Sequence, residues 1–339
     1  MEDNLWIEEK IEIVETIDEA LEKLGDKALF VVDEILLNRT PSLQVFLKGK
    51  EYQKLFASEL TKNLDTVRLI YEFLFDHDAA ELVAIGGGII GDMAGFAAAT
   101  FKRGIPLTLV PTTLLSMCDS SIGGKTGVNY KGVKNYIGSF KKPAKIVIAK
   151  DFLLTLPDKE IKSGLGEIIK CGLIDDRSIL DTLKRDEFSL HQLPYLELIT
   201  KSLKVKHKII KEDFLDQGKR NILNFGHNIA HGLEGYFEGT LTHGEAVALG
   251  ILVELKISEE KLSLDKEVFY LIEDIMKKYE MDTKLQIVDP EEVLYFIRKD
   301  KKNDSHLRFT LLKEVGSAVI KEAITEDEIK RNLESIMEL

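Results

Sequence analysis

Short runs of β-branched and apolar residues alternate with helix-type periodicity through the first half of the chain, and this alternation restricts the fold more than any other feature. The runs that predict strands are 28–33, 43–48, 82–88, 106–113 and 144–150. Between the second and third runs, residues 51–76 carry apolar side chains at helical spacing and predict a helix. Alternation of this kind requires a mostly parallel sheet covered by helices. We therefore predict an α/β domain with a Rossmann-like, mostly parallel sheet.

The periodicity changes near Leu156, and residues 158–306 are almost entirely helical in pattern. The longest amphipathic stretches are 193–214, 243–261 and 265–280. A short strand-like return at 308–320 precedes a last helix at 326–338.

A chain of 339 residues is long enough for two domains of ordinary size. We predict an α/β domain over residues 1–157 and a mainly α-helical domain over residues 158–339. No long linker rich in Gly or Ser separates these halves, so we expect them to pack directly, with the active site in the cleft between them.

Composition narrows the class of protein. The chain is 44% hydrophobic and 31% charged, which is typical of a soluble globular protein. Its net charge of −12 argues against a nucleic-acid partner. The start of the chain has no signal-peptide pattern and no stretch is apolar enough for a membrane span. Two cysteines, Cys118 and Cys171, fit a reducing compartment, and we expect a cytoplasmic location.

A glycine-rich turn follows the predicted strand at 82–88. Residues 86–91 read GGGIIG, which satisfies G-x-G-x-x-G, and such glycines let backbone N–H groups approach a pyrophosphate at a helix N-terminus. Asp92 follows directly, and Thr112 and Thr113 end the next strand, so polar side chains surround a phosphate-sized space. The motif alone is equally typical of a tight strand–helix turn in any α/β domain.

The ordinary dinucleotide fingerprint also has an acidic residue about 20 residues downstream, on the next strand. Residues 108–112 offer none. We therefore expect the acid that binds the ribose to lie upstream, at Asp33 or Glu51.

Three histidines lie close together in the helical half. His227 and His231 are four residues apart on one helix face, and His243 begins the next predicted helix. By spacing alone, these three are the predicted ligands of a divalent metal, with Glu167 as a base. Three protein ligands leave an open position at which a metal polarises a substrate hydroxyl or carbonyl. A chance cluster or a capping role is the alternative.

Basic residues gather beside the Gly-rich and His-rich segments although the whole chain is acidic. The set is Arg103, Lys125, Lys134, Lys170, Lys206, Arg220 and Lys301. Most lysines are solvated, so many of these charges could be ordinary helix-face residues. Like charges that converge in a partly buried cleft repel one another unless an anion lies among them. Convergence therefore predicts a substrate with more than one negative charge.

Together these segments resemble the 3-dehydroquinate synthase family. The runs that carry the resemblance are 86–104, 111–129, 134–140, 156–172, 220–237, 241–250 and 298–304. They occur in order from about Lys27 to Asp304.

The resemblance implies a phosphate-eliminating lyase that converts 3-deoxy-D-arabino-heptulosonate 7-phosphate to 3-dehydroquinate. It implies tightly held NAD and a zinc or cobalt ion. In the family's cycle NAD oxidises a ring hydroxyl, phosphate is eliminated, and the same cofactor returns the hydride. Ring opening and an aldol closure then give the carbocycle, so NAD is used catalytically.

The resemblance also implies roles for individual residues. The metal ligands become Glu167, His227 and His243, and His231 moves to the substrate side. The implied substrate contacts are Asp119, Lys125, Asn135, Lys170, Lys206, Arg220, Asn224, His231 and Lys301. The implied NAD contacts are Asp33, Glu51, Lys54, Gly86, Gly87, Gly88, Asp92, Thr112, Thr113, Lys134, Phe152, Thr155, Leu156 and Glu160. Arg103 resembles a residue that reaches the neighbouring subunit's active site, which implies a homodimer.

One position departs from the family pattern. Asp216 stands where the family's E-x-G-x-R motif has Glu, so the carboxylate before Arg220 has a shorter reach.

Three other classes of function stay open at this point. An iron-dependent or glycerol-dehydrogenase-like polyol dehydrogenase would share the glycine turn and the metal, but its neutral substrates need no cation set. Another sugar-phosphate cyclase would keep the phosphate site. A non-catalytic nucleotide- or metal-binding module would leave the paired Glu167 and Lys170 without a purpose.

Overall fold

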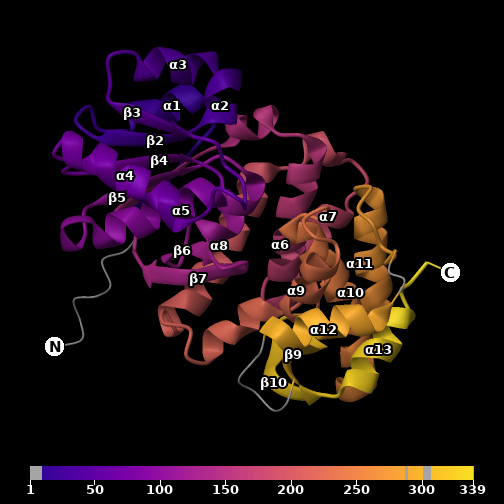
Figure 1. Cartoon of the computed structure of the whole chain (residues 1–339). Helices are drawn as coiled ribbons and strands as arrows, with labels where there is room; N and C mark the ends of the chain where they lie inside the picture. The colour runs from indigo at the N-terminus through magenta and orange to yellow at the C-terminus, as the bar shows by residue number, and fades with distance from the viewer. Residues whose placement is uncertain (1–9, 287–288, 301–306, 339) are drawn as a thin grey trace. The chain divides into compact units, whose positions relative to one another are not determined.

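The computed structural model describes residues 10–286, 289–300 and 307–338 (Figure 1). The chain divides into two compact units, Met1–Pro157 and Asp158–Leu339. In the described residues, none of the helices combines the length and the apolar content that a bilayer crossing needs.

The first unit is built on a parallel sheet of six strands in the order β1-β8-β5-β4-β2-β3. These strands are β1 (Lys10–Val14), β2 (Leu29–Asp33), β3 (Tyr52–Leu55), β4 (Leu82–Gly86), β5 (Leu107–Pro111) and β8 (Lys145–Ala149). Every residue of β4 and β5 is buried, which is typical of parallel strands covered on both faces.

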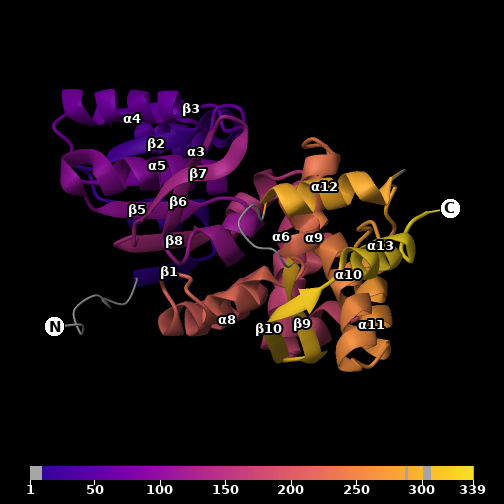
Figure 2. The same ribbon diagram turned by 60° about the horizontal axis from the view of Figure 1, so that its bottom comes forward.

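Helices and one hairpin pack around this sheet. The helices are α1 (Ile17–Glu22), α2 (Glu34–Arg39), α3 (Pro41–Leu47), α4 (Leu64–Asp76) and α5 (Gly88–Thr100). Helix α5 packs against β4, β5 and α4, and the antiparallel hairpin of β6 (Lys125–Tyr130) and β7 (Val133–Phe140) packs against α5 (Figure 2). Short helical segments follow three of the elements: the 3₁₀ helices η1 (Phe101–Arg103) and η3 (Lys150–Thr155), and the π-helical segment η2 (Ser116–Ser120).

The second unit is mainly helical. Its helices are α6 (Asp158–Ile174), α7 (Ser178–Lys184), η4 (Leu190–Gln192), α8 (Tyr195–Glu212), η5 (Lys219–Asn224), α9 (His227–Tyr236), α10 (His243–Leu262), α11 (Glu267–Lys278), α12 (Pro290–Asp300) and α13 (Glu326–Glu334). An antiparallel pair, β9 (Leu307–Glu314) and β10 (Ser317–Ile324), completes it. Helix α10 is buried along most of its length because α6, α9, α11, α13 and β9 all pack against it.

The predicted fold class is confirmed: an α/β unit with a parallel sheet precedes a mainly helical unit. The expectation that the active site occupies a cleft between the units stays a prediction.

Two of the predicted elements were wrong. Residues 43–48 were predicted as a strand, but Pro41–Leu47 form α3, with Pro41 in the first turn and Leu43 and Leu47 buried one turn apart. The helix predicted over 51–76 begins only at Leu64, because Tyr52–Leu55 pair with β2 as the edge strand β3.

The sequence patterns also missed several short elements. These are β1, α1, α2 and the hairpin of β6 and β7.

Candidate active site

Glu167 is a buried carboxylate in the middle of α6. Its side chain is 1% exposed, and its Oε2 forms an ion pair with Lys170, one turn further along the same helix. Burial by itself would raise the pKa of Glu167, but the charge of Lys170 and the neighbouring His227 hold that pKa well below its usual value. Glu167 is therefore ionised inside the protein.

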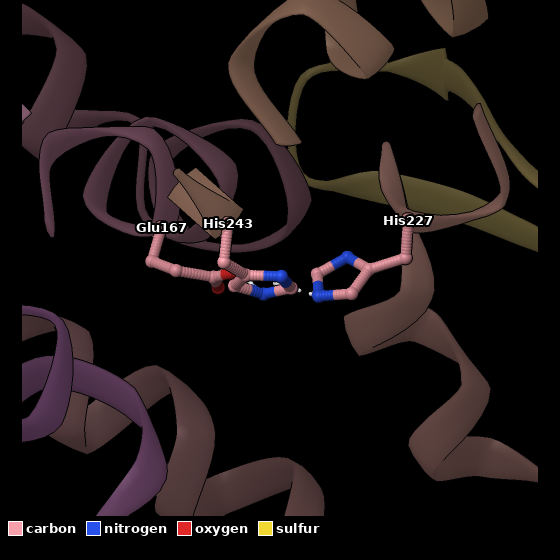
Figure 3. Close-up of side chains that lie close together, drawn as sticks. All are labelled: Glu167, His227 and His243. Atoms are coloured by element: carbon pink, nitrogen blue, oxygen red, sulfur yellow. Dashed lines mark ion pairs between the residues drawn. The ribbon is translucent and has the colours of Figure 1, made fainter. Parts of the chain in front are cut away.

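Two histidines face this carboxylate from two other helices (Figure 3). The Nε2 atom of His227, at the start of α9, lies 3.3 Å from Glu167 Oε1. The Nε2 atom of His243, at the start of α10, lies 3.6 Å from the same oxygen. One ligand atom from each of the three residues lies within 4.8 Å of the other two.

A glycine contact between α6 and α10 brings these residues together. A Cβ on Gly244 would lie 1.7 Å from the carbonyl oxygen of Ser163, and one on Gly166 would lie 2.1 Å from the carbonyl oxygen of Gly244. The two backbones therefore touch where the helices cross. His243 precedes one of these glycines and Glu167 follows the other, so the crossing sets their separation.

The other ring nitrogen of each histidine also has a partner. His227 Nδ1 lies 3.2 Å from the carbonyl oxygen of Phe225, and His243 Nδ1 lies 3.6 Å from Glu234 Oε2. Burial, aided by the charge of Lys170, lowers the pKa of His227 to about 4. Burial would also lower the pKa of His243, but its contacts with Glu167 and Glu234 raise that pKa to about 10.

The three residues fit a divalent cation. Among the described residues, the ion pair with Lys170 is on Oε2, while the buried Oε1 accepts no hydrogen bond of normal geometry and faces the two histidine rings. Oε1 of this ionised carboxylate faces two imidazole rings, and one carboxylate with two imidazoles is an ordinary zinc set.

The group chosen by spacing alone was different. His231 is exposed and its ring centre lies 6.0 Å from that of His227, but it is not one of the three converging residues. The crossing of α6 and α10 brings Glu167 into the third position. This crossing joins residues far apart in the sequence, so the spacing of the histidines could not predict it.

Three predicted substrate-binding cations are buried in the same unit. Lys170, Lys206 and Arg220 are 1%, 5% and 4% exposed and belong to α6, α8 and η5, which pack against one another. The Nη1 of Arg220 donates to the carbonyl oxygen of Phe214 at 2.7 Å. Ordinary surface lysines are not buried in this way.

Two more of the predicted substrate residues lie on neighbouring elements. Asn224 ends η5 and its Nδ2 donates to Asn221 Oδ1 at 3.2 Å, while His231 lies on α9. Lys301 lies outside the described residues.

The glycine turn in the first unit joins β4 to α5, with Gly87 as the N-cap. The register pairs Val32 with Ile85, which places the end of β2 beside this turn. In the sheet, β3 lies on one side of β2 and β4 lies on the other, so the order of the strands reverses at β2. Parallel sheets bind ligands at the carboxyl ends of the strands where the order reverses in this way. A pocket here is lined by Gly86, Gly87, Gly88, Asp92, Ser120 and Lys125 among others.

Lys62 is a residue of this region that the sequence analysis missed. It is 4% exposed, its Nζ lies 2.6 Å from Asp92 Oδ2, and the same Nζ donates to Asn135 Oδ1 at 2.6 Å. Lys62 therefore connects the glycine turn to the hairpin. Its sequence signal is weak because a lysine before a helix cap, here Asn63, is usually solvated.

Other predicted nucleotide residues have local partners. Asp33 Oδ1 accepts hydrogen bonds from Ile35 and Leu36 and caps α2, and burial raises its pKa. Glu51 pairs with His77 at 3.1 Å and Lys54 pairs with Glu34 at 2.6 Å. Glu51 and Lys54 are exposed, at and beside the edge strand β3, and are not among the residues lining the pocket.

The remaining predicted residues are distributed as follows. The N–H of the buried Thr112 donates to Gly86 O at 3.1 Å, and Thr113 Oγ1 donates to Ser116 Oγ at 2.9 Å. Phe152 is buried in η3, and its carbonyl oxygen accepts a hydrogen bond from Thr155 Oγ1. Leu156 directly follows η3. Glu160 lies in the first turn of α6, and burial raises the pKa of its carboxyl group. Asp119 lies in η2, Lys134 is exposed on β7, and Arg103 is exposed after α5.

Family models match most of the chain. The model described as 3-dehydroquinate synthase N-terminal matches residues 53–163, and the model described as 3-dehydroquinate synthase C-terminal matches residues 164–303.

Individual relatives carry the same description. A 3-dehydroquinate synthase of Clostridium tetani (strain Massachusetts / E88) is 43% identical over 282 residues, which cover 81% of this chain and 76% of the relative. A 3-dehydroquinate synthase of Dehalococcoides mccartyi (strain ATCC BAA-2266 / KCTC 15142 / 195) is 35% identical over 96% of this chain and 94% of its own length.

Among solved structures, a 2-epi-5-epi-valiolone synthase from Streptomyces hygroscopicus subsp. jinggangensis 5008 has a TM-score of 0.89 to this chain. It was solved with NAD+ and Zn2+ bound, covers 98% of this chain and 97% of its own, and is 23% identical. At that identity the likeness shows a shared fold.

Proposed function

The chain belongs to the 3-dehydroquinate synthase family, and from this premise we propose that it converts 3-deoxy-D-arabino-heptulosonate 7-phosphate to 3-dehydroquinate and phosphate. One observation carries the proposal from family to site. Glu167, His227 and His243 converge as a metal-binding group beside the buried cation Lys170. A substrate that carries both a phosphate and a carboxylate suits a metal flanked by buried cations.

Glu167, His227 and His243 would hold a zinc or cobalt ion, which supplies Lewis acidity to a substrate hydroxyl or carbonyl. Lys170 keeps Glu167 ionised, so Glu167 would not have to lose a proton before it binds the metal. Lys170, Lys206 and Arg220 would hold the anionic groups of the substrate. We assign the same task to Lys125 and Lys301, with Asp119, Asn135 and Asn224 binding hydroxyls.

His231 would donate or accept a proton at the phosphate group that leaves the substrate. Its side chain is exposed and is not one of the three converging residues, so it could exchange a proton while Glu167, His227 and His243 hold the metal.

NAD would bind at the glycine turn and supply the hydride acceptor and donor of the cycle. The turn aims backbone N–H groups of α5 at a pyrophosphate, and Asp92, held by Lys62, lies beside it. We keep the remaining predicted NAD contacts as part of this proposal: Asp33, Glu51, Lys54, Thr112, Thr113, Lys134, Phe152, Thr155, Leu156 and Glu160.

We also propose a cytoplasmic homodimer in which Arg103 reaches the neighbouring active site. Arg103 is exposed, so its guanidinium is available to a neighbouring subunit. Both Lys102 and Arg103 have left-handed backbone conformations, with φ of 48° and 64°. The cysteines, Cys118 and Cys171, are both free and buried, which suits a reducing compartment.

The decisive experiment incubates the enzyme with the heptulosonate phosphate, NAD and zinc and measures released phosphate. Stoichiometric phosphate with 3-dehydroquinate as the carbon product supports the proposal. Oxidation of glycerol with accumulation of NADH, and no phosphate release, would favour the polyol dehydrogenase. Phosphate release with a different carbocycle would favour another sugar-phosphate cyclase.

A further inference from the structure

Glu234 lies on α9, seven residues after His227, and therefore on the same face of that helix. Its side chain is 11% exposed, and its Oε2 lies 3.6 Å from Nδ1 of His243. None of the catalytic roles proposed above uses this carboxylate, although it is mostly removed from solvent and directed at one of the three converging residues.

The position of Glu234 matters because of which ring nitrogen it faces. His243 presents Nε2 to Glu167 Oε1, so Nδ1 is the nitrogen left for an outer partner. An ionised carboxylate only accepts hydrogen bonds, so it favours the tautomer with the proton on Nδ1. That tautomer leaves the Nε2 lone pair free to bind a metal.

The two histidines are oriented by different means. His227 Nδ1 faces the backbone carbonyl of Phe225 at 3.2 Å, two residues earlier in its own segment. His243 depends instead on a side chain from another helix. Helix α9 thus supplies both a converging histidine and the carboxylate that faces the histidine on α10.

We propose that Glu234 is a positioning residue of the metal site: its carboxylate accepts a hydrogen bond from Nδ1–H of His243 and so directs Nε2 of that ring at the cation. This inference rests on the metal site of the proposed function. It assigns Glu234 no contact with substrate or NAD.

The test measures metal affinity on purified, metal-free enzyme, using Co2+ and Zn2+ alone in competition with a chelator. Glu234→Ala should weaken binding by about 10- to 100-fold, the usual effect of losing a partner that orients a ligand. Glu234→Gln should keep part of the affinity because its amide oxygen can still accept a hydrogen bond from Nδ1–H of His243. The visible absorption of bound Co2+ should change in Glu234→Ala.

Glu245→Gln is the matched control. Glu245 is two residues from His243, but its Oε2 accepts from Thr242 N at 2.9 Å in the capping box of α10. Its loss removes a carboxylate from the same neighbourhood without touching the ring. Metal affinity and the Co2+ spectrum should match the parent within about threefold, a difference well below the loss expected of an orienting partner.

The outcomes are separable. If the parent binds neither metal, both the metal site and this inference fail. If the parent binds metal, and both Glu234→Ala and Glu234→Gln bind it as tightly as the parent does, only this inference is overturned. The melting temperatures of the metal-free variants distinguish lost affinity from lost folding, and the isosteric Gln variant decides the matter if the Ala variant does not fold.

Discussion

Glu167 is a buried carboxylate that stays ionised inside the protein, which is the state that a metal ligand needs. Burying a carboxylate is unfavourable unless opposite charge lies in contact with it. Lys170 supplies that charge one helical turn away, and the pKa of Glu167 stays well below its usual value as a result. The carboxylate is thus already ionised for the metal that we propose it binds.

Alanine variants of His243 and His231 distinguish a proposed metal ligand from a proposed substrate-side histidine. We expect His243→Ala to lose metal and activity together, because removing one of three ligands from an open site weakens it strongly. His231→Ala should keep a full equivalent of metal and lose turnover. Metal content by elemental analysis, measured beside phosphate release, checks both. A His243→Ala enzyme that retains its metal would show that the ligand set is wrong.

Replacing Arg220 tests the anion-binding role of the buried cations. Truncating one partner of a buried, charge-assisted pair costs roughly 2–5 kcal/mol. Arg220→Ala should therefore lower kcat/KM for the heptulosonate phosphate by about one and a half to three and a half decades. Metal content should stay at the parent value, because the proposed ligands are other residues.

Lys219→Ala is the control for Arg220. Its side chain is 55% exposed and pairs with Glu212, so steady-state kinetics should give a kcat/KM within about threefold of the parent. An equally small effect of Arg220→Ala would mean that its burial serves structure alone and would remove the main support for a polyanionic substrate.

At the residue scale, the sequence predicted part of the site. Histidine spacing pointed to His227 and His243, and the resemblance replaced His231 by Glu167. Ligand atoms of Glu167, His227 and His243 lie within 4.8 Å of one another, and their role as metal ligands stays a prediction. Lys62 was missed because its burial depends on Asp92 and Asn135, which are distant in the sequence. Spacing along one helix carries no information about contacts of this kind.

At the scale of elements, the same limit explains the errors in the fold. The strands β2, β4, β5 and β8 are buried runs of β-branched residues and were readily predicted. The edge strand β3 has mostly exposed or half-buried residues, so only its pairing with β2 distinguishes it from the start of a helix.

The crossing of α6 and α10 gives a prediction at this scale. Gly244→Ala places a methyl group 1.7 Å from the Ser163 carbonyl oxygen, so the two helices must separate. We expect a loss of stability of about 1–3 kcal/mol or more, typical of overpacking, and weaker metal binding because Glu167 and His243 move apart. Thermal unfolding of the metal-free enzyme and a metal titration measure the two effects.

Gly25→Ala is the matched control. Its new Cβ would lie 3.8 Å from Glu81, which is ordinary van der Waals contact. Stability and metal affinity should therefore match the parent. If Gly244→Ala behaves in the same way, the glycine contact does not set the geometry of the metal group.

At the scale of the whole molecule, the chain has a nucleotide-type glycine turn in one unit and, in the other, three converging residues that could hold a metal. A simple dehydrogenase would need the same two parts. The buried cations Lys170, Lys206 and Arg220 are the additional feature, and they stand against a net charge of −12. We interpret them as a site for a substrate whose phosphate leaves during the reaction. The fate of the hydride then distinguishes such a phosphate-eliminating lyase from a simple dehydrogenase.

We therefore expect NAD to be used catalytically by the whole enzyme. NAD would accept a hydride from the substrate and return it before the product leaves, so the overall reaction would be an elimination of phosphate without net oxidation. With NAD far below the substrate concentration, many equivalents of phosphate should be released, and absorbance at the NADH band should show no net rise. Removing the metal with a chelator should stop phosphate release, and adding zinc or cobalt should restore it. Accumulation of one NADH per product would contradict this and make the enzyme a net oxidant of its substrate.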